Sequence, residues 1–184
     1  TTWVEKSWEG ILASQAAHYL VPGNAASRSE LLYLAKNAIW ELLQQLRAAD
    51  IVAVTCEEKI IDVPFLGGHI GGFIDLKVTN QKGEIGLIDL KLGGLSYRRE
   101  ELMKGRHLQL AIYGHLVKSK YGKKAHCAYF IFSGGGKLLT RSNHFFPNAE
   151  MVFPKDGGPE DEWQECWSNF EKLWSIRRSQ LDTG

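Results

Sequence analysis

Two aspartates and a lysine lie on neighbouring predicted strands, at spacings that bring them to one place. Asp75 ends the segment 72–75 (GFID), while Asp89 and Lys91 belong to the segment 88–91 (IDLK). Residues 80–83 predict a tight hairpin turn between the two strands. In such a hairpin Asp75 lies opposite Asp89 or the residue before it.

The alternation of side chains along a strand sets their directions. Asp89 and Lys91 are two positions apart and therefore share one face, while Ile88 and Leu90 point into the core. Cross-strand neighbours lie roughly 5 Å apart at Cβ, so the carboxylates of Asp75 and Asp89 converge.

This group of side chains suits hydrolysis of a phosphodiester. Paired carboxylates repel unless something neutralises them, and carboxylate and carbonyl oxygens are ligands that suit Mg²⁺ or Mn²⁺. An ammonium group beside the ion can hold or deprotonate a water and stabilise charge on a phosphate. An Asp-x-Lys segment alone is more often a surface ion pair. The addition of Asp75 across the hairpin favours the catalytic interpretation.

The elements that position these residues follow from hydrophobic periodicity and turn signals. We predict helices over residues 3–19, 27–49, 99–119 and 161–180, and strands over 51–63, 69–78, 84–91, 126–133 and 138–146. Ser27 and Glu30 resemble a capping box at the start of the second helix. The order α-α-β-β-β-α-β-β-α predicts an α/β fold with a central mixed sheet flanked by helices, antiparallel at first.

Composition places limits on the class of protein. The three cysteines, Cys56, Cys127 and Cys166, are far apart without a CxxC pair, so we expect reduced, buried thiols in a cytoplasmic protein and no zinc or iron–sulfur site. No apolar run reaches the roughly 18 residues of a membrane span. We interpret residues 1–184 as a single domain, cut from a longer parent because the chain starts at Thr1 without a methionine.

The net charge of +1 conceals an uneven distribution. Residues 96–124 are rich in lysine and arginine, whereas residues 149–171 are mainly acidic. A basic stretch of this kind indicates either a face that binds a polyanion or a solvated helix face. The acidic segment could dock a partner domain.

Three motifs together resemble a known family. Gly-x-x-Asp (Gly72 to Asp75), a hydrophobic-Asp-x-Lys strand (Ile88 to Lys91) and a helical Gln-x-x-x-Tyr (Gln109 to Tyr113) follow one another in the chain. This pattern is similar to the RecB-like branch of the PD-(D/E)xK nucleases, which includes nuclease domains of bacterial helicase–nucleases and the CRISPR-associated exonucleases. Order and spacing match from Glu57 or Glu58 to Leu116, which implies a restriction-endonuclease-like core.

The resemblance implies a role for each matching residue. Asp75 and Asp89 would ligate Mg²⁺ or Mn²⁺, with the backbone carbonyl of Leu90 as a third ligand. Lys91 would position or activate the attacking water. Gln109 and Tyr113, one helical turn apart, would line the site and contact DNA or the lysine. The alternative for this pair is a helix face packed on the sheet.

Several family features are weaker here. Members often carry a further His or Glu ligand on an upstream helix, for which the candidates are His18 and Glu30; otherwise the ligand precedes Thr1. His18 also fits a partly buried helix histidine, and Glu30 a helix cap. Glu58 matches a recurring glutamate whose role is less certain.

Basic side chains directly after the lysine strand are candidates for DNA binding. Arg98, Arg99, Lys104 and Arg106 could supply the phosphate contacts of a non-specific nuclease, with the two arginines on a flexible loop at the mouth of the site. The tryptophans of the last predicted helix repeat at helical spacing, which favours core packing over base stacking.

The expected function is metal-dependent hydrolysis of DNA, as an exonuclease in repair or recombination; the exonuclease choice rests on the resemblance. One alternative is an inactive nuclease fold that binds DNA or serves as a scaffold for a helicase partner. Another is a restriction-type endonuclease, although the loops are short for a recognition region.

Overall fold

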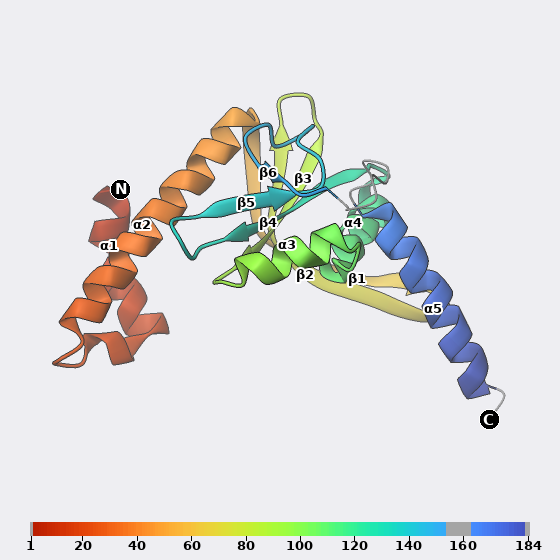
Figure 1. Ribbon diagram of the computed structural model, residues 1–184, viewed down its shortest axis with the longest axis horizontal. Coiled ribbons are helices and arrows are strands. Elements are labelled where there is room, and N and C mark those ends of the chain that lie inside the picture. Colours follow the sequence, from red (N-terminus) through yellow and green to blue (C-terminus); the bar gives the residue numbers. More distant parts are fainter. Residues whose placement is uncertain (1, 154–162, 183–184) are drawn as a thin grey trace.

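The computed structural model describes residues 2–153 and 163–182 and contains one six-stranded mixed sheet with helices on both faces (Figure 1). The helical elements are α1 (Thr2–Gln15), the 3-10 helix η1 (Ala17–Leu20), α2 (Ala25–Ala48), α3 (Leu95–Met103), α4 (Leu108–Tyr121) and α5 (Gln164–Asp182). The strands are β1 (Ile51–Phe65), β2 (Gly68–Asn80), β3 (Ile85–Lys91), β4 (Ala125–Ile131), β5 (Lys137–Thr140) and β6 (Glu150–Met151).

The strands lie in the sheet in sequence order, from β1 to β6. β1, β2 and β3 are antiparallel neighbours, β4 runs parallel to β3, β5 antiparallel to β4, and β6 parallel to β5. Parallel neighbours need a crossover connection, which α3 and α4 supply between β3 and β4. The predicted α/β class, mixed sheet and antiparallel start are confirmed.

Two hydrophobic cores cover the two faces of the sheet. On one face Leu87 and Tyr129 pack with Leu110 and Leu116 of α4 and with Trp163, which together form the α4-side core. On the other face the α2-side core is formed by residues of α2, of the central strands and of the segment after β5, including Ala38, Ile88, Phe130, Phe145 and Phe146. β3 and β4 are therefore buried on both sides, which explains their nearly continuous apolar sequences.

The region between β3 and β4 departs from the prediction of one helix over 99–119. Residues 104–107 separate α3 from α4, and Gly105 has φ 63°, a left-handed conformation that suits glycine. The helical pattern continues across the break because both helices place apolar residues toward the same core.

Two other predicted boundaries were wrong. The strand expected over 138–146 ends at Thr140, and the chain then turns through the buried polar residues Arg141 and Ser142. The capping box is absent, because α2 begins at Ala25 after Asn24, so that Ser27 already lies inside the helix.

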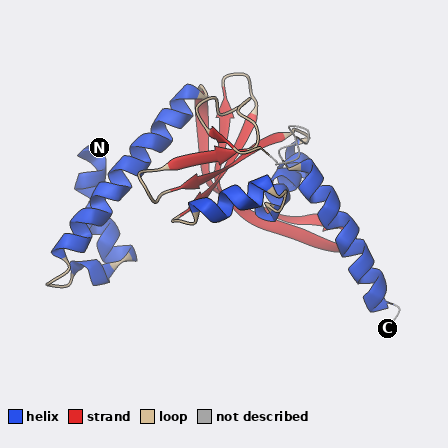
Figure 2. Ribbon diagram, in the orientation of Figure 1, coloured by secondary structure: helices blue, strands red, loops and turns tan. Residues whose placement is uncertain are grey.

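The N-terminal helices form an arm that extends from the sheet (Figures 1 and 2). α1 lies against α2, where Lys36 makes an ion pair with Glu5. Trp3, Tyr33 and Trp40 are exposed on this arm. None of the described helices has the combination of length and apolar character needed to span a bilayer.

The C-terminal α5 is anchored beside α4 and the tip of the β1–β2 hairpin. The Trp163 indole N–H, just before the helix, donates to the carbonyl of Ala125 at 2.8 Å. Near the hairpin tip, the Phe65 ring lies 5.2 Å from that of Trp167 and 5.5 Å from that of Phe170. The prediction of core packing holds for Trp163 and Trp167, which are buried, whereas Trp174 is exposed.

Candidate functional site

The strand register places the two aspartates as the hairpin predicted. Leu76 pairs with Ile88 and Val78 with Gly86, which is one of the two registers that the hairpin predicted, and Asp75 and Asp89 each follow the last pair of this ladder. Ile88 packs in the α2-side core, and Leu90 packs against it. The predicted register and the inward directions of Ile88 and Leu90 are therefore confirmed.

The ladder between β2 and β3 stops just where the aspartates begin. Its last backbone pair is Leu76 with Ile88, and beyond it the Asp75 carboxylate accepts the N–H of Leu90 at 2.7 Å. Ile74 and Leu76 pack in different cores, so the alternation of side chains shifts between them. The Asp75 side chain thus takes the place of a strand carbonyl and is held against β3.

Asp89 has no exposed surface and only part of its bonding capacity is used. Its Oδ2 lies 2.6 Å from Lys91 Nζ, and its Oδ1 has no hydrogen-bond partner within residues 2–153 and 163–182. Burial raises the pKa of this carboxyl, against the opposing effect of the Lys91 ammonium. A buried, incompletely paired carboxylate is costly, and a cation would remove that cost.

The donors at this point fit a hard divalent ion. Asp89 offers an unshared buried oxygen, and Asp75 is a second carboxylate held on the adjoining strand by Leu90. Oxygen ligands of this type suit Mg²⁺ or Mn²⁺. Lys91, with a side chain 21% exposed, lies beside the oxygens and remains in reach of solvent.

The glutamine and tyrosine of the third motif face the same strands from α4. The Gln109 side-chain amide donates to the Tyr113 hydroxyl at 2.9 Å. Burial raises the pKa of Tyr113, and the negative charges of Asp89 and Asp75 add to this effect. Tyr113 packs between α4 and the sheet, as the alternative for this pair expected, and a role of the pair in the site stays a prediction.

The glycine of the first motif makes room for that tyrosine. A Cβ on Gly72 would lie 3.2 Å from Tyr113 Cε1 and 3.3 Å from Leu116 Cδ1, closer than ordinary van der Waals contact. The spacing Gly-x-x-Asp thus places the α4 contact and Asp75 on one short stretch of β2.

Arg98 lies deeper in the site than its sequence context suggested. It belongs to α3 and not to a flexible loop, its guanidinium lies 5.2 Å from the centre of the buried Tyr129 ring, and it pairs with Glu101. Its positive charge also acts to lower the pKa of Asp89. Glu101 and Tyr129 escaped the sequence analysis; the only signal was the i, i+3 spacing of Arg98 and Glu101.

The other basic candidates are also paired with acids. Arg99, likewise in α3, makes two bonds to Glu150 of β6, at 2.5 and 2.7 Å. Lys104 and Arg106 are both exposed and share Glu100, at 2.6 and 3.2 Å. The stretch is therefore less strongly basic than its sequence, although these pairs lie at the surface.

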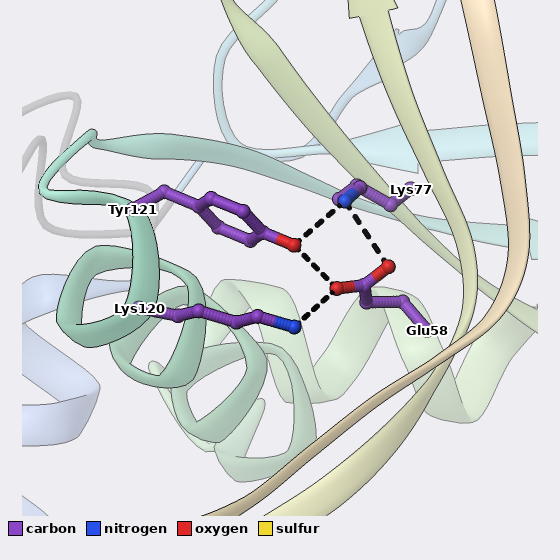
Figure 3. Close-up of polar contacts among 4 residues, drawn as sticks. All are labelled: Glu58, Lys77, Lys120 and Tyr121. Carbon is purple, nitrogen blue, oxygen red and sulfur yellow. Dashed lines mark hydrogen bonds and ion pairs between the residues drawn. The ribbon is translucent and has the colours of Figure 1, made fainter.

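Glu58 lies in a separate polar cluster that joins β1, β2 and the end of α4 (Figure 3). It accepts from Lys120 at 2.8 Å, from Lys77 at 3.1 Å and from the Tyr121 hydroxyl, which itself accepts from Lys77. These donors, led by Lys120 and Tyr121, lower the pKa of Glu58 to about 2. Its bonds within the fold are sufficient to explain this residue.

The two candidates for an upstream ligand lie elsewhere. His18 is exposed in η1 and Glu30 is exposed on α2, both within the arm that extends from the sheet (Figure 1). The expectation of a partly buried His18 was wrong, because η1 leaves it at the surface. Of the predicted thiols, Cys127 and Cys166 are buried, whereas Cys56 is exposed on β1.

Comparison with known proteins agrees with this architecture. None of the curated proteins matches the chain significantly. The family model of the PD-(D/E)XK nuclease superfamily matches residues 1–177, which include the sheet, the aspartate–lysine strands and most of α5. The chain therefore belongs to the PD-(D/E)XK nuclease superfamily.

Proposed function

We propose that this protein is a metal-dependent DNA nuclease of the RecB-like branch, acting as an exonuclease in repair or recombination. The observation that carries the proposal is the fully buried Asp89, which has one oxygen without a partner in the described part of the chain and the other beside Lys91. Burying a carboxylate without full pairing costs stability, and groups of this kind cluster at sites that bind a ligand or a metal ion.

The residues would divide the work of hydrolysis. Asp75, Asp89 and the carbonyl of Leu90 would hold Mg²⁺ or Mn²⁺. Such an ion supplies Lewis-acid charge for the phosphate and lowers the pKa of water. Lys91, fixed by its ion pair with Asp89, would hold and orient the attacking water. Gln109 and Tyr113 would line the site from α4 and hold either the lysine or the substrate.

DNA would be bound through the basic side chains around α3. Exposed ion pairs contribute little free energy, so a phosphate can replace Glu100 beside Lys104 and Arg106. Arg98 and Arg99 would meet the backbone closer to the carboxylates. Contacts of this kind read no sequence, which suits an exonuclease. The choice of exonuclease rests on the three motifs that resemble the RecB-like branch.

The test is cleavage of end-labelled linear DNA and of circular DNA, with Mg²⁺, with Mn²⁺ and with EDTA. We expect degradation of linear DNA only, lost with EDTA and in Lys91→Ala, but retained in Lys172→Ala, an exposed lysine on α5. Cutting of circles would show an endonuclease. No cleavage together with Mn²⁺ binding that Asp89→Ala abolishes would favour an inactive or incomplete site. Absence of both cleavage and metal binding would overturn the proposal.

A further inference from the structure

A second group of metal-binding side chains lies away from the aspartates. Glu84 precedes β3, His126 lies near the start of β4, and His144 lies between β5 and β6. One ligand atom from each lies within 4.8 Å of the other two. Against the expectation of no zinc site, which rested on the cysteines alone, we propose that Glu84, His126 and His144 bind Zn²⁺ in a site that is separate from the nuclease site and does not depend on its assignment.

The two sites lie on opposite faces of the sheet. The His126 ring stacks on Phe145 with 5.1 Å between centroids, and Phe145 belongs to the α2-side core. Asp89 shares its face with Leu87, which packs in the α4-side core. Glu84 and Asp89 are also separated along the strand by roughly 16 Å, at about 3.3 Å per residue. An ion at one site therefore makes no contact with the other.

The carboxylate of this cluster is already oriented. Glu84 Oε2 accepts from the Asn80 side-chain amide at 2.7 Å, and Asn80 Oδ1 accepts the backbone N–H of Glu84 at 2.9 Å. Glu84 Oε1 is then directed to His144, 3.7 Å from its Nε2. Hydrogen bonds that orient metal ligands in this way are a regular part of metal sites.

The remaining adjustment is small. Zinc–nitrogen bonds of 2.0–2.1 Å in a tetrahedron set ligand atoms roughly 3.3 Å apart, somewhat closer than the cluster has them. His144 can close the difference, because its side chain is 66% exposed. Glu84 and His144 also line a cleft of about 230 Å³, through which an ion can reach them.

The chemistry of the donors selects the ion. Two imidazoles and one carboxylate are ligands of Zn²⁺, with water in a fourth position, whereas Mg²⁺ prefers oxygen alone. The three ligands come from the β2–β3 turn, from β4 and from the segment that carries Phe145 and Phe146. Bound zinc would join these segments and thereby stabilise the fold.

The site can be tested by calorimetry and thermal unfolding of metal-free protein. The titrations use Zn²⁺ in excess Mg²⁺, in the Asp89→Asn variant, so that the aspartate site does not contribute. We expect one Zn²⁺ per chain and a rise in Tm of a few degrees. In His144→Ala, affinity should fall at least about 10-fold and the rise in Tm should disappear. His69→Ala, which removes another exposed histidine, should bind Zn²⁺ and gain Tm as the Asp89→Asn protein without this change does.

The outcomes separate this proposal from the nuclease assignment. Absence of saturable Zn²⁺ binding in the parent, or binding unchanged in both His144→Ala and Glu84→Gln, would overturn it whatever the cleavage assays give. If His126→Ala fails to fold, His144→Ala still decides, because the exposed side chain of His144 packs little. Loss of nuclease activity with Zn²⁺ binding intact would leave the site standing.

Discussion

Glu58 and Asp89 are two acidic side chains with little exposure to solvent, and their surroundings are opposite. The Glu58 side chain is 12% exposed and accepts from two lysines and a tyrosine (Figure 3). Asp89 is 0% exposed, with one ion pair and one oxygen that lacks a partner in the described residues. The pKa of Glu58 is lowered and that of Asp89 is raised.

Under the proposed function, the difference is that between a residue that serves the fold and one that serves a ligand. The donors of Glu58 belong to the chain itself, so folding completes this cluster. Asp89 loses hydration on folding without full replacement among the described residues, and under the proposed function a bound cation supplies the missing partner. Sites that keep binding capacity in this way reduce stability, and four measurements test whether the contrast holds.

The largest expected effect is on cleavage. Asp89→Asn keeps the shape of the side chain but removes its charge, so cleavage should fall by about 100-fold or more, while Tm stays level or rises because a buried charge is gone. Glu58→Gln should keep the parental rate per folded molecule. Equal loss in both variants, measured on linear DNA with Mg²⁺, would erase the distinction.

The next effect is on stability. Glu58→Gln loses charge-assisted bonds to Lys77 and Lys120, so the free energy of unfolding should fall by about 1–3 kcal/mol. Urea unfolding measures this, with the exposed Glu30→Gln as the matched control. A fall of the same size in Glu30→Gln would show that the effect is not specific to the cluster.

The pH dependence of stability sharpens the same contrast. The pKa of Glu58 is lowered from 4.5 to about 2, so its contribution is present above 4.5 and is lost as pH falls toward 2. The pKa of Asp89 is raised from 3.8, so its contribution is present below 3.8 and is lost as pH rises through the raised value. Between about pH 2 and 6, the free energy of unfolding of the parent relative to Glu58→Gln should therefore rise with pH, whereas its free energy of unfolding relative to Asp89→Asn should fall. Unfolding curves of the three proteins at several pH values measure both differences.

The smallest expected effect concerns packing beside Asp89. In Gly72→Ala the new methyl group presses on Tyr113 and Leu116, at a cost of about 1 kcal/mol and with a modest loss of cleavage. Gly10→Ala in α1 meets nothing within 4 Å and should be neutral or slightly stabilising. Thermal unfolding and initial cleavage rates of both variants provide the measurement. A Gly72→Ala protein with parental stability and rate would show that Tyr113 can move freely.

Sequence predicted the elements whose periodicity and turns are local. A short turn and alternating strands were enough to set the register of β2 on β3 up to Leu76 and Ile88, next to the two aspartates, because hairpin geometry follows from loop length. The break between α3 and α4 was missed because both helices share one apolar face. The Tyr129 ring beside Arg98 and the Glu150 partner of Arg99 lie on other segments, which no local pattern reports. The same reason hid Glu84, His126 and His144, which only the folded sheet brings together.

The anchoring of α5 has a consequence for the order of folding. Its contacts are made with Phe65 at the far end of the β1–β2 hairpin and, through Trp163, with Ala125, so they close very long loops of chain. Closing such loops costs chain entropy, and contacts can offset this cost only after the segments that α5 contacts have folded, so the step is slow. We therefore expect the hairpin and β4 to form first and α5 to dock last. Pulse-labelled hydrogen exchange during refolding should find the amides of α5 protected after those of β3 and β4.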